Sequence, residues 1–135
     1  MDICVSLIVA SVKMGTPAPQ TECLMDCTDA AQPRIPSVII SSSDTSILQI
    51  PRKLLTRLTG LHARNDGTGW INLSQGKIIE DIDSKKVYIP FGCLIPENID
   101  IKDSNYQWIN ISNIFSDGNS SVDIEMIKQL AYLLK

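Results

Sequence analysis

Four basic side chains lie within a short stretch of the sequence, and their chemistry suits the binding of phosphate groups. They are Arg52, Lys53, Arg57 and Arg64, and the single histidine, His62, lies beside them. Guanidinium and ammonium groups hold phosphates through charge-assisted hydrogen bonds. One hypothesis is therefore a small nucleic-acid-binding domain that uses the basic helix 52–64. The alternative is a solvent-exposed helix face without a ligand, which is the commoner use of such charges.

The two tryptophans occur in matching pentapeptides, Trp-Ile-Asn-Leu-Ser and Trp-Ile-Asn-Ile-Ser. In an extended strand Trp70 and Asn72 share one face, as do Trp108 and Asn110. We expect two strands of one sheet with like faces, which would form an amphipathic patch if the strands are neighbours. Indoles and amides in such a patch could stack on a base or a sugar ring, or anchor a protein partner. The alternative is that one or both tryptophans cover the end of the core.

The cysteines offer two further chemistries, neither of them complete. Cys23 and Cys27 have the spacing of the first half of a zinc site, but Cys4, Cys93 and His62 supply no matching second pair. We therefore predict no metal. Cys93 with His62 is the one candidate nucleophile and base, although a single thiol is more often a buried core residue.

No other catalytic pattern is present. Glu80, Asp81 and Asp83 have no recognisable acid/base or metal-ligand spacing and indicate a charged turn. The sequence contains no glycine-rich phosphate loop, no His-Glu-x-x-His motif and no nucleophile elbow. These absences favour a protein that is not an enzyme and that needs no cofactor.

The composition is that of a globular protein of one domain. The chain has 135 residues, 44% of them hydrophobic and 20% charged, with a net charge of -3. This charge argues against broad, non-specific binding of nucleic acid. The abundant isoleucine favours β-structure.

The first part of the chain predicts a strand, an arm, a hairpin and a helix. Residues 1–14 contain an apolar run expected as a buried strand, and residues 15–36 form a Pro/Gly/Thr-rich arm or linker. Residues 38–40 and 47–50 are β-branched runs that indicate a hairpin. A leucine stripe predicts a helix over about 51–61, with proline at its first position.

The remainder predicts short strands and a terminal helix. Strands are expected at residues 70–73, 77–82 and 87–89, followed by an irregular or edge segment between Pro90 and Pro96. An amphipathic helix is expected over about 121–134. With residues 37–135 taken as a single domain, we predict an α+β fold with a small, mostly antiparallel sheet of short strands.

The leading hypothesis is a non-enzymatic interaction or structural subunit of a larger viral or cellular assembly, which binds a protein partner or itself. The apolar run is too short to cross a bilayer and lacks the basic residues of a signal peptide, so an intracellular location without a membrane span is expected. The nucleic-acid-binding domain is the alternative, using the basic cluster and the Trp70/Trp108 face. The expected partner-binding residues are Trp70, Asn72, Trp108, Asn110, Ile124, Ile127, Leu130 and Leu134.

Overall fold

The computed structural model describes residues 2–13, 20–29, 32–40, 47–64, 71–95, 99–116 and 121–129. The strands are β1 (Asp2–Lys13), β2 (Gln20–Asp26), β3 (Ser37–Ile39), β4 (Ser74–Gln75), β5 (Ile79–Asp81), β6 (Lys86–Ile95) and β7 (Tyr106–Asn110). The helices are α1 (Gln49–Thr59), α2 (Ile111–Ser116) and α3 (Ser121–Lys128). The predicted α+β class is confirmed.

The strands form one seven-stranded sheet with the order β4-β6-β1-β2-β7, in which β3 also pairs with β1 and β5 with β6. β1 and β6 are parallel from Asp2↔Lys86 to Ser11↔Ile95, and this is the longest pairing between the described strands. The other pairings are antiparallel. The sheet is therefore mixed but mostly antiparallel, as expected, with the pairing of β1 and β6 as the parallel exception.

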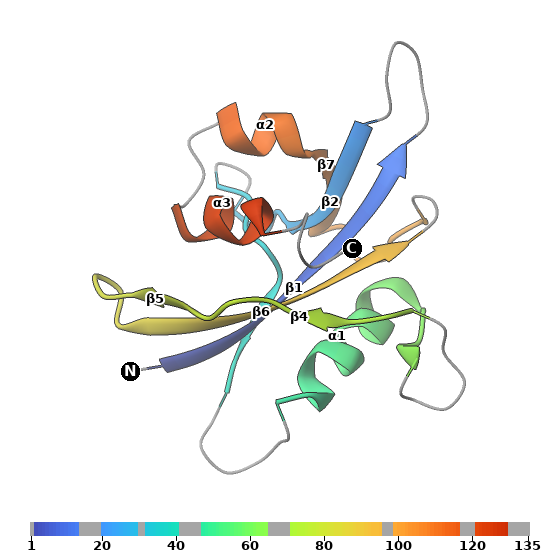
Figure 1. Cartoon of the computed structure of the whole chain (residues 1–135). Helices are drawn as coiled ribbons and strands as arrows, with labels where there is room; N and C mark the ends of the chain where they lie inside the picture. Colours follow the sequence, from blue (N-terminus) through green and yellow to red (C-terminus); the bar gives the residue numbers. More distant parts are fainter. Residues whose placement is uncertain are drawn as a thin grey trace.

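β1 lies at the centre of the sheet because both of its faces are apolar, as in a strand covered on both sides. Cys4, Ile8 and Ala10 belong to the core cluster that contains residues of α2 and α3. Val5 and Leu7 alternate with them and belong to the cluster that contains the leucines of α1. The helices accordingly cover opposite faces, with α2 and α3 on one side and α1 on the other (Figure 1).

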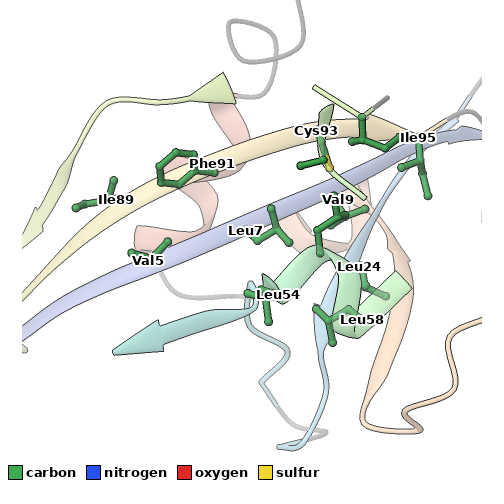
Figure 2. Packing of buried hydrophobic residues seen from close by; sticks show 13 residues of the cluster. Val5, Leu7, Val9, Leu24, Leu54, Leu58, Ile89, Phe91, Cys93 and Ile95 are labelled. Carbon is green, nitrogen blue, oxygen red and sulfur yellow. The ribbon is translucent and has the colours of Figure 1, made fainter. Parts of the chain in front are cut away.

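α1 is the helix that the leucine stripe predicted, and it begins two residues earlier than expected. Its buried side chains are Pro51, Leu54, Leu55 and Leu58. Figure 2 shows Leu54 and Leu58 directed at the sheet, near side chains of β1 and β2. The helix ends at Gly60, whose φ of 76° is left-handed and whose N–H donates to the carbonyl O of Thr56 at 2.8 Å.

The predicted hairpin at residues 38–40 and 47–50 is wrong in its second half. Ser37–Ile39 is the strand β3, but Gln49 and Ile50 are the first residues of α1. The β-branched side chains of this run predicted a strand only weakly. The helix that carries the leucine stripe begins within the run, at Gln49, and this tertiary preference overrides them. The residues expected to connect the two strands, 41–46, lie outside the described part of the chain.

The segment between Pro90 and Pro96, expected to be irregular or an edge, is instead part of β6. Phe91 and Cys93 are buried, and β6 has neighbours on both sides. Pro90 is tolerated because it lies between the residues that pair with β5 and those that pair with β4. Its carbonyl O accepts a hydrogen bond from Gly76 N at 2.8 Å, so the N–H that proline lacks would face the same gap.

Two other expectations about the strands need correction. Residues 20–26, within the expected arm, form β2 between β1 and β7. The two tryptophan pentapeptides do not lie on neighbouring strands: Trp108 is in β7 at one edge of the sheet, while the segment after Trp70 leads into β4 at the other edge. Trp70 itself lies outside the described residues.

The predicted C-terminal helix is present as α3, and the last part of the prediction, residues 130–134, lies outside the described residues. α3 ends at Lys128, and residues 130–135 are outside the described part of the chain. Its Val122, Met126 and Ile127 pack in the core beneath the sheet. Among the described residues, no helix combines the length and apolarity needed to cross a bilayer.

Candidate functional site

A small pocket lies between the beginning of α1 and the segment that leads into β4. It has a volume of about 130 Å³. Its buried lining residues are Pro51 of α1, Ala63, Ile71 and Phe91 of β6. An apolar floor of this kind excludes water from whatever group enters the pocket.

Backbone hydrogen bonds hold the two sides of this pocket together. Arg64 N donates to the carbonyl O of Ile71 at 2.8 Å, and Ile71 N donates to the carbonyl O of His62 at 3.4 Å. Ala63 and Ile71 therefore form a parallel bridge. Gly60 ends α1 just before this bridge, so the chain leaves the helix there and Arg64 lines the same pocket as the beginning of α1.

The rim of the pocket is polar and positively charged. Arg52 of α1, Arg64 and Asn72 line it, with Arg52 half-buried and the other two exposed. Within the described part of the chain, no carboxylate pairs with either arginine. Two guanidinium groups and an amide above an apolar floor supply directed hydrogen-bond donors for an anion.

A second, shallower hollow of about 330 Å³ runs along the exposed side of α1. It is lined by Gln49, Arg52, Lys53, Thr56 and Arg57. Arg52 lines both hollows. The predicted basic cluster is thus brought together by the fold, with Arg52 and Arg64 at the pocket and Lys53 and Arg57 farther along the helix.

Carboxylates for a divalent cation are missing from the described part of this site. α1 carries no acidic residue, and none lines either hollow. No group of three or more histidine, cysteine, aspartate or glutamate side chains among the described residues is placed to hold a metal ion. Since Mg²⁺ is held by oxygen ligands, and chiefly by carboxylates in proteins that handle phosphates, the described residues do not fit such an ion.

A larger cavity lies elsewhere, between β4 and α3. Its volume is about 550 Å³, and it is lined by Ser74–Lys77, Glu125, Lys128 and Gln129. The Gln129 side chain already binds the strand segment, because its Oε1 accepts from Lys77 N at 2.9 Å. Lys77, Glu125 and Lys128 are exposed, so this cavity lacks the buried floor of the α1 pocket.

The structure gives the predicted tryptophan and asparagine residues separate environments. Trp108 packs against the α1-side core, and its Nε1 donates to the carbonyl O of Ile99 at 3.0 Å. Asn110 accepts from Ser112 N at 2.9 Å and donates to Gln20 Oε1 at 3.0 Å. Asn72 is at the rim of the α1 pocket.

The predicted helical contact residues divide between core and surface. Ile127 is 3% exposed and belongs to the core, whereas Ile124 is partly exposed. Leu130 and Leu134 lie outside the described residues. A partner surface on α3 therefore remains a prediction that depends on Ile124.

The cysteines do not form a site in the described structure. Cys23 and Cys93 are buried, and burial raises the pKa of each thiol to about 12. A thiol with this pKa is protonated at neutral pH and is a poor nucleophile. His62 is exposed, so the pairing of Cys93 with His62 as nucleophile and base is wrong.

Sequence reasoning missed the apolar half of the pocket. Ala63, Ile71 and Phe91 come from segments that meet only in the folded chain. Each one reads in the sequence as an ordinary core residue. The available signal was the cluster of arginines, which identified the rim but not the cavity beside it.

Neither a family model nor a curated protein sequence matches the chain. Solved structures do resemble it. A mutT/nudix family protein from Listeria innocua has a TM-score of 0.72 at 13% identity, with 95% of this chain and 90% of the other covered. The E. coli dihydroneopterin triphosphate pyrophosphohydrolase has a TM-score of 0.67 at 10% identity, covering 94% and 92%. The NUDIX domain of Shewanella oneidensis NrtR, complexed with ADP ribose, has a TM-score of 0.63 at 13% identity, covering 94% and 84%.

The chain has a Nudix-like fold. This finding corrects the functional expectation, because the neighbours are Nudix proteins that include a pyrophosphohydrolase. The prediction of a structural subunit without enzymatic activity is wrong. The nucleic-acid-binding alternative is not better supported, although one of the similar structures is Shewanella oneidensis NrtR complexed with a 27mer DNA.

Proposed function

We propose that the chain is a Nudix-type hydrolase whose α1 pocket takes a phosphorylated, nucleotide-like small molecule. The observation that carries the proposal is the pair of guanidinium groups, Arg52 and Arg64, which face an apolar-floored pocket without a carboxylate partner in the described structure. Guanidinium groups match phosphate oxygens in geometry as well as charge.

The sizes of the two hollows support a ligand with a phosphate end and a larger remainder. The pocket of about 130 Å³ is below the usual range for a whole small molecule, about 300–1,000 Å³, and suits phosphate groups alone. The hollow of about 330 Å³ beyond Arg52 has room for a ring system. We therefore place the phosphates between Arg52, Arg64 and Asn72, and the remainder along α1.

The named neighbours support the same ligand class. One is named for a triphosphate that it cleaves, and another is a domain complexed with ADP ribose. Both compounds contain a phosphoanhydride. The proposed reaction is its hydrolysis, in which water oxygen bonds to one phosphorus, the bridging oxygen leaves with the electron pair, and a proton is released.

The chain's own residues would bind and orient the substrate. Arg52 and Arg64 neutralise the phosphate charge, and the buried floor keeps bulk water away from the bound group. The described residues at the pocket include no carboxylate, so no general base is assigned among them.

The test is an assay of purified protein with ADP-ribose and a panel of nucleoside triphosphates, with products separated by chromatography. We expect turnover of at least one compound, and a loss of about tenfold or more in kcat/KM for Arg52→Gln and for Arg64→Gln. Lys128→Gln is the matched control, because it removes one exposed positive charge that lines the other cavity. Absence of turnover and of binding for every compound would overturn the proposal.

A further inference from the structure

We infer that this site binds the phosphates of its ligand directly through arginine, without a divalent cation. The inference rests on the proposed function and concerns how the ligand is held, not how it is cleaved. Proteins that act on phosphoanhydrides commonly place Mg²⁺ between carboxylates and the phosphate oxygens. The described α1 pocket is lined by positively charged side chains, whereas a Mg²⁺ site needs negatively charged carboxylates.

The charged groups that face the pocket are all cationic in the described structure. Arg52 and Arg64 line the pocket, and Lys53 and Arg57 continue the same sign along α1. The remaining polar group is the neutral amide of Asn72. A free divalent cation at this position would be repelled by like charges and would find no carboxylate among the described residues.

The two arginines come from separate segments, and the backbone of each segment is anchored in the core. Arg52 follows Pro51, which is buried in the pocket floor, and Leu55 one turn later is fully buried. Arg64 follows Ala63, which is 2% exposed and bridged to Ile71. The backbone beneath each guanidinium is thus anchored in the core, and only the side chains need to order when an anion arrives.

In this arrangement the two arginines neutralise the phosphate charge, as a metal ion does in other sites. Two guanidinium groups supply two positive charges, and each offers paired donors to phosphate oxygens. The chain itself carries these charges, so they need no cofactor. Free Mg²⁺ would compete for the same phosphate oxygens in solution rather than complete the site.

The experiment is isothermal titration calorimetry of ADP-ribose, and separately of inorganic pyrophosphate, into the whole chain. Each titration is run in buffer with EDTA and in buffer with MgCl₂. We expect binding of at least one probe in EDTA, with a Kd within about threefold of the value in Mg²⁺ or tighter. Arg52→Gln and Arg64→Gln should each raise the Kd by about tenfold or more in EDTA, since each removes charge-assisted hydrogen bonds.

The controls separate the two proposals. Lys128→Gln should leave the Kd unchanged, and the circular dichroism spectrum of each variant reports whether it is folded. Binding that appears only with Mg²⁺ would overturn the metal-independent inference and leave the proposed function standing. Absence of binding in both buffers would overturn both. Binding in EDTA that survives both arginine substitutions would place the phosphates elsewhere and also contradict the inference.

Discussion

At the scale of single residues, the buried thiols show how burial in the core changes the pKa of a side chain. Cys93 lies in β6 and Cys23 in β2, and both are almost completely buried. Burial penalises the thiolate and raises the pKa of each to about 12 from an ordinary value of 9.0. The Coulombic interaction with Cys23 raises the pKa of Cys93 further. The partly exposed Cys27 differs from both in access to solvent.

These thiols give a pH dependence of stability whose sign follows from the raised pKa. Below pH 9 both are protonated in the folded and the unfolded state, so their contribution to stability is fully present. As the pH rises from about 9 towards 12, unfolded thiols ionise while folded ones do not, and that contribution is lost. Urea denaturation at pH 8 and at pH 10 should show a lower free energy of unfolding at pH 10.

A Cys93→Ala variant tests the assignment, because it should make the difference between the two pH values smaller than in the wild type. Thiol labelling offers an independent check: at pH 8 Cys27 should react before Cys23 and Cys93, which should react only in urea. Rapid labelling of Cys93 in the folded protein would contradict its burial.

At the scale of elements, α3 is attached to the chain that precedes β3 by a buried carboxylate. Asp123 is 1% exposed, and its Oδ2 accepts from Arg34 Nε at 2.8 Å and from Ile35 N at 3.1 Å. Burial raises the pKa of the Asp123 carboxyl, and the hydrogen bond and charge of Arg34, with the N–H of Ile35, oppose that rise. The pair orients α3 against the core more specifically than its apolar residues alone would.

Removal of this carboxylate should lower the stability of the protein. Asp123→Ala leaves Ile35 N–H buried without a partner and Arg34 without its carboxylate, so we expect a loss of about 2–4 kcal/mol. Asp123→Asn should cost less, because its amide oxygen still accepts from Ile35 N. Asp83→Ala, at an exposed turn, is the control and should stay within about 0.5 kcal/mol of the wild type in urea denaturation. Equal stabilities for Asp123→Ala and the control would contradict the role assigned to the pair.

The elements that the sequence predicted well are those with local patterns. The leucine stripe of α1 and the apolar run of β1 follow from residues close together in the chain. β6 was broken up at Pro90 because proline normally ends a central strand, and only the gap between β4 and β5 makes it acceptable there. The gap depends on where β4 and β5 pair with β6, so the residues beside Pro90 in the sequence do not indicate it.

At the scale of the whole molecule, the pairing of β1 with β6 determines the architecture and joins the first strand to one far along the sequence. Asp2 pairs with Lys86 and Ser11 with Ile95, in register along almost the full length of both strands. No local pattern indicates so distant a parallel pairing. The sequence predicted β1 and the first part of β6, but not that they pair. The candidate site follows the same rule: its arginines were visible in the sequence, and its floor required the fold.

The central claim is that the α1 pocket is the ligand site, and the most direct measurement is a two-dimensional NMR titration with ADP-ribose. We predict that the Nε–Hε signals of Arg52 and Arg64, the side-chain amide of Asn72 and the backbone of Ala63 and Ile71 shift together with one Kd. Shifts gathered instead at Ser74–Lys77 and Lys128, or no shift at saturating ligand, would contradict it.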